Sequence, residues 1–304
     1  MNIEQKQALL AYARENNIPM GEDVSLKDHT SFRIGGPAAL LTIPANGQEL
    51  AALCALADDL GVRWVILGNG SNVLAADEGF DGLVIKTTGM NTITISHGMV
   101  MAEAGVTLYK LATEAGAQEL TGLEFAQGIP GTLGGAIYMN AGAYEGEMSQ
   151  VVTAVSAYDT ANRKVLSFTR DQLELGYRTS IFTKHPEWII LGAIFELEYG
   201  EGQEIFAKMG DLAKLRRDKQ PLDKPSAGST FKRPEGYYAA KLIDDCGLKG
   251  CTVGGAQVSE KHAGFVVNLG DATAADVKQL ICRVQDTVRE NTGVELEPEI
   301  KFLG

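Results

Sequence analysis

The sequence has few of the residues that build metal sites or disulfide frameworks. It contains four cysteines and four histidines in 304 residues, and no Cys-x-x-Cys pair. The histidines lie far apart in the sequence, so we expect neither a structural zinc site nor a set of disulfides, and we predict no bound metal. Each cysteine is expected to be a small buried hydrophobic side chain. These residues are Cys54, Cys246, Cys251 and Cys282.

Long hydrophobic runs and excess positive charge are also absent. No window of about 18 apolar residues is present, and residues 1–17 lack the basic start and unbroken apolar core of a signal peptide. Lysine and arginine number 27 against 39 aspartates and glutamates, which gives a net charge of −12. Such a charge repels nucleic acids and anionic membranes. We therefore expect a cytoplasmic protein that has neither as a partner and that binds anions through locally placed cations and backbone N–H groups.

Three common motifs of ligand binding and catalysis are missing. Position 73 is valine, where the dinucleotide fingerprint of a Rossmann fold would need glycine after Gly68 and Gly70. The sequence has no Gly-Lys dipeptide, which excludes the phosphate loop of nucleoside triphosphatases. It also has no Gly-x-Ser-x-Gly, which excludes the usual nucleophile of α/β-hydrolases.

Glycine, in contrast, is abundant and clustered. There are 35 glycines in 304 residues, above the roughly 7% of an average protein. The first cluster, Gly-Asn-Gly-Ser-Asn at 68–72, follows an apolar, strand-like run that ends at Leu67. Its residues tolerate positive φ and leave successive N–H groups free to converge on an anion, as in a pyrophosphate-binding loop. An ordinary turn after a strand explains this cluster equally well.

The second cluster spans residues 128–142 and contains five glycines. Pro130 fixes one turn. Gly134 and Gly135 have no side chains and precede a helical segment, whose first N–H groups can bind a negatively charged group. Such a segment is suited to binding a flat, anionic cofactor. Tight backbone packing explains one or two of these glycines but not the whole run.

The pattern of apolar residues predicts two α+β domains with a boundary near residue 200. The first domain mixes helices and strands, including a hairpin within residues 153–168. The second contains a long amphipathic helix that starts at Thr273 and ends at Gly293. The charged run 216–225 is expected to be an exposed connection. Neither half alternates strands and helices regularly, which argues against one doubly wound sheet.

Six motifs, in order along nearly the whole chain, make the sequence resemble the UDP-N-acetylenolpyruvoylglucosamine reductase family, also called UDP-N-acetylmuramate dehydrogenases. Six ordered matches are very improbable by chance. The length favours the shorter class of this family, which lacks an inserted substrate loop that bears a tyrosine. The motifs are His-Thr-Ser-Phe-Arg-Ile-Gly-Gly at 29–36, Leu-Gly-Asn-Gly-Ser-Asn at 67–72, the glycine cluster at 128–142, Tyr-Arg-Thr-Ser-Ile-Phe at 177–182, Ala-Gly-Ser-Thr-Phe at 227–231 and Leu-Glu-Pro-Glu at 296–299.

The resemblance implies a vanillyl-alcohol-oxidase-type FAD-binding domain in residues 1–200 and a smaller α+β substrate-binding domain in residues 201–304. In this family NADPH reduces bound FAD, which passes hydride to the enolpyruvyl group of a UDP-sugar and so forms UDP-N-acetylmuramate for peptidoglycan. Segments 67–74 and 128–146 contain no histidine or cysteine, so we expect FAD to be held non-covalently, with NADPH as co-substrate. The residues expected to hold FAD are Arg33, Gly68, Asn69, Gly70, Ser71, Asn72, Gly128, Pro130, Gly131, Gly134, Gly135, Asn140 and Gly142.

Three polar residues match the catalytic positions of the family. Hydride addition leaves negative charge at the carboxylate end of the substrate, and a guanidinium can stabilise that charge through two parallel hydrogen bonds. Arg178 matches the arginine in this role, although a surface ion pair is the commoner fate of an arginine. Ser229 matches the proton donor, although a turn serine beside glycine more often bonds its own backbone. Glu299 matches the catalytic glutamate, and Glu297 is the second choice because it shares one face of an extended segment.

The residues expected to contact the substrate are Tyr177, Lys232, Arg233 and Lys301. Lys232 is also a candidate to stabilise the alkoxide that a proton-donating Ser229 would leave. Arg233 stands where some members of the family carry Asn, and Lys301 where many carry Arg. Two other functions stay open: a flavin oxidase or dehydrogenase of the same fold with another substrate, and a flavin- or UDP-sugar-binding protein without catalysis. No obligate protein partner is expected.

Overall fold

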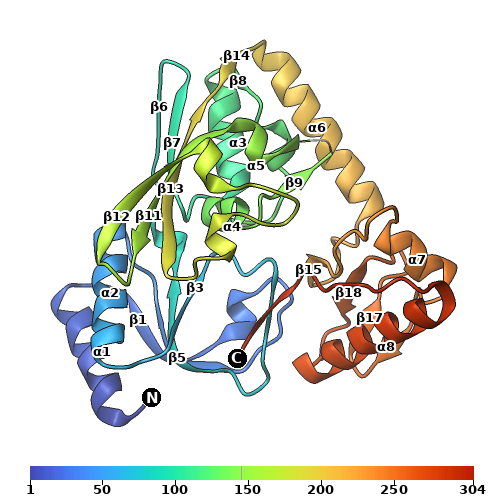
Figure 1. Cartoon of the computed structure of the whole chain (residues 1–304), viewed down its shortest axis with the longest axis horizontal. Helices are drawn as coiled ribbons and strands as arrows, with labels where there is room; N and C mark the ends of the chain where they lie inside the picture. Colours follow the sequence, from blue (N-terminus) through green and yellow to red (C-terminus); the bar gives the residue numbers. More distant parts are fainter. Residues whose placement is uncertain (145) are drawn as a thin grey trace. The chain divides into compact units, whose positions relative to one another are not determined.

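The computed structural model describes residues 1–144 and 146–304, whose contacts form two compact units (Figure 1). Each unit is discontinuous in sequence. Unit 1 comprises Met1–Glu22, Leu40–Asn69 and Gly82–Arg216, and unit 2 comprises Asp23–Ala39, Gly70–Asp81 and Arg217–Gly304. The assignment of residues 1–200 to the cofactor and 201–304 to the substrate stays a prediction.

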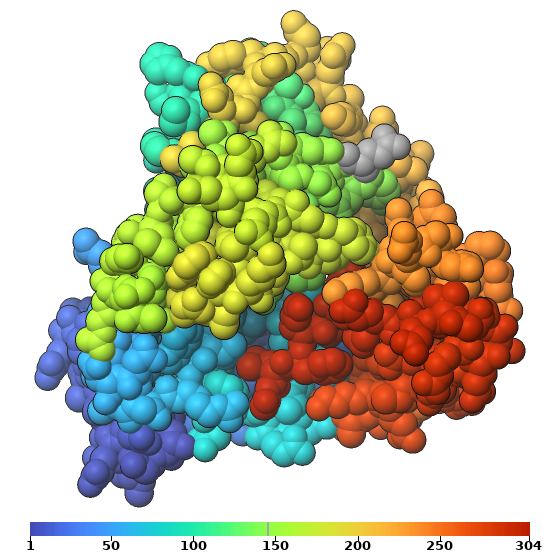
Figure 2. Space-filling model, viewed as in Figure 1, coloured from blue at the N-terminus to red at the C-terminus, as the bar shows by residue number. Residues whose placement is uncertain are grey.

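Two helices and those parts of a four-stranded sheet that belong to unit 1 enclose the first core of this unit. The strands lie in the order β1 (Met20–Ser25), β2 (Pro37–Thr42), β5 (Phe80–Lys86) and β3 (Trp64–Leu67), with β3 parallel to β5. Helices α1 (Ile3–Glu15) and α2 (Gly47–Asp59) bury Leu9, Leu50 and Leu53 against strand residues such as Leu83 and Ile85. The dark blue residues of α1 and the lighter blue residues of α2 lie on the surface in the space-filling view (Figure 2). Burial of apolar area is the main force that holds these elements together.

A second sheet of unit 1 carries the segments around the second glycine cluster. Its five antiparallel strands lie in the order β12 (Lys164–Thr169), β11 (Val152–Asp159), β13 (Trp188–Glu196), β7 (Met99–Glu103) and β6 (Ile93–Ser96). The predicted hairpin within residues 153–168 is confirmed as the β11–β12 pair, in which Asp159 opposes Lys164. Helices α3 (Leu108–Ala117) and α4 (Leu133–Tyr138) contribute to the same hydrophobic core through Leu111 and Leu133.

Short elements complete unit 1. The strand pairs are β8 (Leu120–Thr121) with β14 (Glu198–Tyr199), and β9 (Gly142–Ala143) with β10 (Gly146–Glu147). Helix α5 (Met148–Val151) follows β10, and helix α6 (Gly202–Lys219) ends the long continuous part of the unit. The expectation of an exposed connection over residues 216–225 is wrong for its first four residues, which extend α6. Their Lys, Arg and Asp side chains are compatible with a helix as well as with a loop.

Unit 2 is a small sheet covered by two helices. The antiparallel strands lie in the order β15 (Ser226–Ser229), β18 (Phe265–Asn268), β17 (Ala256–Val258) and β16 (Thr252–Val253). Helices α7 (Ala239–Asp245) and α8 (Ala274–Thr292) pack against this sheet, and the C-terminal strand β19 (Lys301–Leu303) pairs in parallel with β4 (Val73–Ala75).

The long helix of unit 2 is confirmed by α8. Thr273 caps its N-terminus by accepting a hydrogen bond from the N–H of Asp276 at 3.0 Å, and Gly293 ends it with a φ of 74°. The apolar positions Val277, Leu280, Ile281, Val284 and Val288 are all buried. The apolar residues that recur every 3.6 residues therefore identify the face of the helix that packs against the core.

The prediction for the cysteines is confirmed in part. Cys54 is buried, and burial raises the pKa of its thiol far above the usual range, which makes it an inert core residue. Cys282 is exposed on α8, so the expectation of a buried side chain is wrong there. A helix has a polar face, and position 282 lies on it.

Two kinds of feature are absent from the described residues. These residues contain no helix long and apolar enough to cross a membrane. They also contain no group of three or more His, Cys, Asp and Glu side chains that could hold a metal ion.

Candidate active site

The first two residues of the first glycine loop lie in unit 1, and the first of them, Gly68, contacts the second glycine cluster. The loop begins where β3 ends at Leu67. A Cβ atom added to Gly68 would lie 2.3 Å from Oγ1 of Thr132, so only glycine fits at this position. The two clusters, 60 residues apart in the sequence, therefore meet at Gly68 and Thr132.

Backbone hydrogen bonds fix the second cluster on the core of unit 1. The N–H groups of Leu133 and Gly134 donate to the carbonyl oxygens of Val106 and Ala104, both at 2.8 Å. An added Cβ at Gly134 would lie 3.1 Å from Cβ of Ala104, whereas one at Gly135 would meet nothing closer than Oγ1 of Thr132 at 3.8 Å. Gly134 is thus needed for packing, and Gly135 is the position where open space lets a ligand approach the backbone.

Thr132 is a candidate binding residue that the sequence analysis missed. It is the N-cap residue of α4, where a threonine hydroxyl normally accepts a hydrogen bond from the first turn, yet its side chain makes no such bond. Thr132 is 2% exposed, and its Oγ1 has no hydrogen-bond partner among the described residues. A buried, unsatisfied hydroxyl requires an explanation, and an anionic group bound beside Gly68 and Gly135 supplies one. The signal available in the sequence was a threonine at the helix start, between Pro-Gly and Leu-Gly-Gly.

A polar pocket lies next to the first loop within unit 1. Its volume is about 370 Å³, and two of its lining residues are lysines. Lys86 is half-buried, and burial lowers the pKa of its ammonium group. Nζ of Lys110 donates to the carbonyl oxygen of Asn91 at 2.8 Å. The sequence analysis missed both lysines, because neither belongs to a motif. The pocket is lined by Asn69, Lys86, Thr88, Asn91, Gly105, Thr107 and Lys110.

A third cation, Arg216, lies beside the start of the second glycine cluster. An added Cβ at Gly128 would lie 3.2 Å from Cδ of Arg216, which comes from α6. Burial lowers the pKa of the Arg216 guanidinium, and no ion pair to it is found in the described part of the chain. A partly desolvated guanidinium without a carboxylate is suited to receive an anionic ligand. Arg216 was not among the predicted site residues.

Arg178 occupies a closed turn of unit 1. Gly176 and Thr179 exchange two backbone hydrogen bonds of 3.1 and 3.2 Å, and Arg178 lies between them with a φ of 55°. This left-handed conformation costs an arginine about 1–2 kcal/mol, and such strain is found preferentially at functional sites. The guanidinium is half-buried and lies 5.2 Å from the ring centre of Tyr177, which is 53% exposed.

The remaining predicted residues of the second cluster have clear places in unit 1. Pro130 is exposed, and the carbonyl oxygen of Gly131 accepts a hydrogen bond from the N–H of Leu108 at 3.0 Å. Gly142 is needed for packing, because an added Cβ would lie 2.7 Å from Cβ of Glu147. Asn140 is 1% exposed, and both polar atoms of its side chain bond other parts of the protein.

The rest of the first loop lies in unit 2. Gly70 has a φ of 64°, and an added Cβ would lie 2.3 Å from the carbonyl oxygen of His29. The carbonyl oxygen of Gly70 accepts a hydrogen bond from the N–H of Ser31 at 3.1 Å. Asn72 donates from Nδ2 to the carbonyl oxygen of Glu299 at 3.2 Å. Arg33 is exposed with a φ of 54°, and Ser71 is half-buried.

Ser229 and Glu299 are brought together in unit 2. Ser229 is the last residue of β15 and is exposed, while Glu299 is half-buried. The N–H of Glu299 donates to the carbonyl oxygen of Thr230, next to Ser229, at 2.8 Å. Gly228 has a φ of 76°, and an added Cβ would have no neighbour within 4 Å, so the space beside the serine is open.

Lys232 has a partner that bears on its predicted role. Its Nζ forms an ion pair with Oε1 of Glu297, the second choice for the catalytic glutamate. Glu297 is exposed, whereas Glu299 is half-buried. The guanidinium of Arg233 stacks on the ring of Tyr238 at 4.6 Å, and Lys301 is exposed on β19.

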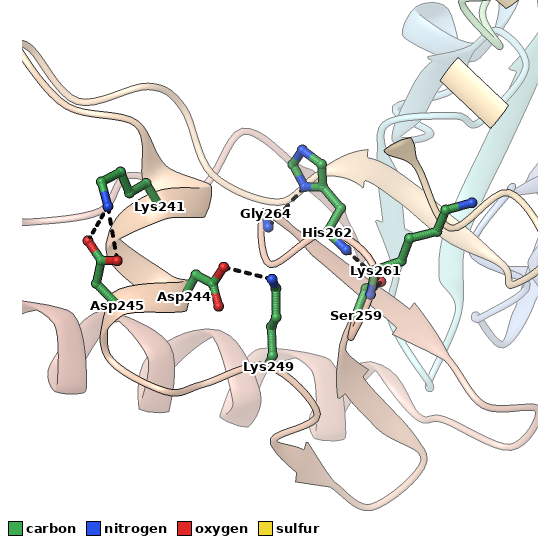
Figure 3. A network of polar contacts seen from close by, with 8 residues as sticks. All are labelled: Lys241, Asp244, Asp245, Lys249, Ser259, Lys261, His262 and Gly264. Carbon is green, nitrogen blue, oxygen red and sulfur yellow. Dashed lines mark hydrogen bonds and ion pairs between the residues drawn. The ribbon is translucent and has the colours of Figure 1, made fainter. Parts of the chain in front are cut away.

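A turn around His262 supports the Ser229 segment (Figure 3). The hydroxyl of Ser259 accepts hydrogen bonds from the N–H groups of Lys261 and His262, and Nδ1 of His262 accepts one from the N–H of Gly264 at 3.1 Å. Burial lowers the pKa of His262, so at neutral pH the ring is uncharged and its proton is on Nε2. The carbonyl oxygen of Gly264 in turn accepts a hydrogen bond from the N–H of Thr230 at 2.8 Å.

The comparisons with known proteins agree with one another. The model of the UDP-N-acetylenolpyruvoylglucosamine reductase C-terminal domain matches residues 220–303, and a model described as an FAD binding domain matches residues 38–169. A UDP-N-acetylenolpyruvoylglucosamine reductase of Caldanaerobacter subterraneus subsp. tengcongensis is 50% identical over 92% of this chain and 92% of its own. One of Clostridium perfringens is 48% identical over 93% of this chain and 92% of its own.

A solved structure gives the same result. The crystal structure of the UDP-N-acetylenolpyruvylglucosamine reductase from Thermus caldophilus superimposes with a TM-score of 0.79 at 34% identity, and the match covers 94% of this chain and 99% of that one. These matches confirm the predicted FAD-binding domain and the smaller domain that follows it.

Gly70→Ala tests whether the close approach of the first loop to the backbone of His29 requires glycine at position 70. Gly61 is the matched control, because its φ is 65° and an added Cβ would meet nothing within 4 Å. Gly61→Ala should cost about 1–2 kcal/mol from the left-handed backbone alone. Gly70→Ala should cost a further ~1–3 kcal/mol because its Cβ would overlap the carbonyl of His29. Urea unfolding measures both losses, and equal losses would show that the loop shifts without cost.

Proposed function

Since the chain belongs to the family of UDP-N-acetylenolpyruvoylglucosamine reductases, we infer that it is an FAD-containing oxidoreductase that reduces the enolpyruvyl group of UDP-N-acetylglucosamine enolpyruvate. The product is UDP-N-acetylmuramate, a peptidoglycan precursor. The observation that carries this inference is identity of 50% over 92% of both chains. The reductant in the proposal is NADPH, and the reaction takes place in the cytoplasm, where nucleotide sugars are made.

Several residues of unit 1 fit an anionic cofactor. The unsatisfied hydroxyl of Thr132, the open backbone at Gly135 and the polar pocket beside Asn69 offer hydrogen bonds and positive charge to a diphosphate. When bound, FAD supplies the hydride chemistry, taking hydride from NADPH and giving it to the terminal carbon of the enolpyruvyl group. We assign no covalent link, because segments 67–74 and 128–146 contain no histidine or cysteine.

Arg178 stabilises the negative charge that develops on the substrate carboxylate. Its guanidinium presents a planar pair of hydrogen-bond donors that matches the two oxygens of a carboxylate. The strained backbone of its turn is consistent with a position selected for function rather than for stability. Tyr177, next to it and exposed, is assigned to substrate contact.

Ser229 donates the proton that the α carbon of the substrate requires. A serine hydroxyl is a weak acid, so its alkoxide needs a nearby positive charge or hydrogen-bond donor. Lys232 lies three residues away but is paired with Glu297, which reduces the charge it can offer. Glu299, held beside Thr230, is assigned to orient the substrate. Lys232, Arg233 and Lys301 are assigned to substrate contact.

Absorbance spectroscopy of the purified protein tests the proposed function. NADPH added without oxygen should bleach the flavin band, and UDP-N-acetylglucosamine enolpyruvate should restore it while UDP-N-acetylmuramate forms. Bleaching without recovery would instead favour a flavin enzyme with another substrate. A protein that binds flavin but is not bleached would be a binding protein, and the proposal would be wrong.

Arg178→Lys separates catalysis from cofactor binding. The charge survives but the planar pair of donors does not, so reoxidation of the reduced flavin by substrate should slow by about 10²–10³-fold. FAD content should match that of Arg170→Lys, an exposed arginine of the same unit. Loss of FAD in parallel with activity would identify Arg178 as a structural residue.

Ser229→Ala separates proton transfer from flavin reduction. The hydroxyl acts only after NADPH has reduced the flavin, so the first half-reaction should keep a near-normal rate in stopped-flow absorbance. The second should slow by ~10²–10⁴-fold, the usual contribution of general acid catalysis. Ser226→Ala, in the same strand, is the control, and Ser229→Cys should retain some activity. Reoxidation of Ser229→Ala at the parent rate would mean that the proton comes from another group.

A further inference from the structure

The end of the second glycine cluster is bonded to both sides of the turn that carries Arg178. Nδ2 of Asn140 donates to the carbonyl oxygen of Gly176 at 3.1 Å, two residues before Arg178. Oγ of Ser180, two residues after Arg178, donates to the carbonyl oxygen of Tyr138 at 2.8 Å. Both bonds lie within unit 1. The segment 138–140 thus holds the turn at its two ends.

The side chain of Asn140 is suited to this place because an amide both donates and accepts. While Nδ2 donates to Gly176, Oδ1 accepts a hydrogen bond from the N–H of Ser149 at 2.9 Å. The backbone of Asn140 has a φ of 43°, which asparagine tolerates better than most residues. With the side chain 1% exposed, each lost bond would leave a buried polar group unpaired.

The turn transmits a displacement of Gly176 to Arg178. Gly176 and Thr179 are joined by two backbone hydrogen bonds, so the residues between them cannot move independently of Gly176. On the other side, Ser180 is fully buried, and its carbonyl oxygen accepts a hydrogen bond from Oγ1 of Thr183 at 2.7 Å. The two bonds to segment 138–140 therefore restrain the backbone on both sides of Arg178.

We propose that Asn140 and Ser180 are positioning residues that fix Arg178 relative to the glycine cluster of the cofactor site. This inference rests on the role of Arg178 in the proposed function. It gives the side chain of Asn140 a different task from the cofactor contact that the sequence predicted. A displacement of about 1 Å in such a group can cost ~10²-fold in rate, so loss of either hydrogen bond is expected to slow catalysis.

Asn140→Asp tests the proposal through its dependence on pH. The ionised carboxyl group can still accept from Ser149, but it places a negative oxygen against the carbonyl of Gly176. When protonated, it can donate to that carbonyl again. Burial raises the pKa of the introduced carboxyl group, so protonation occurs within a usable pH range.

Stopped-flow measurements on the purified flavoprotein should therefore separate the two half-reactions of Asn140→Asp. Above the pKa of the introduced group, reoxidation by the enolpyruvyl substrate should be ~10–100-fold slower than in the parent, and the rate should recover relative to the parent as the pH falls. FAD content and the rate of reduction by NADPH should stay within about twofold. Amide hydrogen exchange in the 176–179 peptide, a readout independent of activity, should speed up at high pH.

Three variants serve as comparisons. Asn140→Gly keeps the left-handed backbone but loses both bonds, so reoxidation should be slow at every pH. Ser180→Ala removes the second bond and should slow reoxidation with normal FAD content, which tests the proposal even if Asn140→Asp does not fold. Thr42→Val is the matched control, because it removes from unit 1 a hydroxyl-to-carbonyl bond of the same 2.8 Å length at a residue that is also 0% exposed. It should leave both half-reactions unchanged.

The outcomes distinguish this inference from the proposed function. Reoxidation at the parent rate in both Asn140→Asp and Ser180→Ala, with Arg178→Lys still slow, would overturn the positioning role alone. Reoxidation at the parent rate in Arg178→Lys as well would overturn the role of Arg178 itself. Parallel loss of FAD content and of both half-reactions in Asn140→Asp and Ser180→Ala would show that the two bonds support the cofactor site rather than Arg178.

Discussion

The arrangement of unit 1 depends on how segment 131–140 is held. At its start, backbone bonds from Leu133 and Gly134 to the segment before α3 fix its path, and an added Cβ at Gly134 would lie only 3.1 Å from Cβ of Ala104. At its end, Asn140 and Tyr138 bond the Arg178 turn. A single short segment therefore carries the open backbone at Gly135 and also restrains the backbone on both sides of Arg178. Such shared constraints explain why many glycines cluster here, since backbone approaches this close exclude larger residues.

In unit 2, backbone pairing between extended segments brings the candidate catalytic residues together. The C-terminal segment runs beside the residues after β15, so that one backbone hydrogen bond places Glu299 next to Thr230 and Ser229. Asn72 adds a side-chain bond to the same segment. The neutral ring of His262 shapes the turn that supports Thr230 from the other side. Ordinary backbone pairing thus brings together two residues 70 positions apart.

Features that depend on residues close together in the sequence could be predicted, whereas features that depend on distant residues could not. Helix α8 and the β11–β12 hairpin were predictable because their periodicity, caps and turns are local. The role of Asn140 was not, because its partners Gly176 and Ser149 are identified only by the fold. Thr132 is an intermediate case: its place at a helix start is local, but its lack of a cap bond is not. The two discontinuous units are the extreme case, since long-range packing alone defines them.

The protein has a net charge of −12 and therefore repels anionic ligands as a whole. To bind such a ligand, it needs cations placed close to the binding site. In unit 1 the side chains of Lys86 and Arg216 are partly buried, and this burial lowers the pKa of both. Partial burial costs free energy while the site is empty, because a charge loses some of its hydration. A bound anion restores favourable interactions to that charge and raises its pKa again. An anion bound beside these side chains would therefore interact with a charge that is only partly hydrated, and this local attraction would act against the negative field of the whole protein.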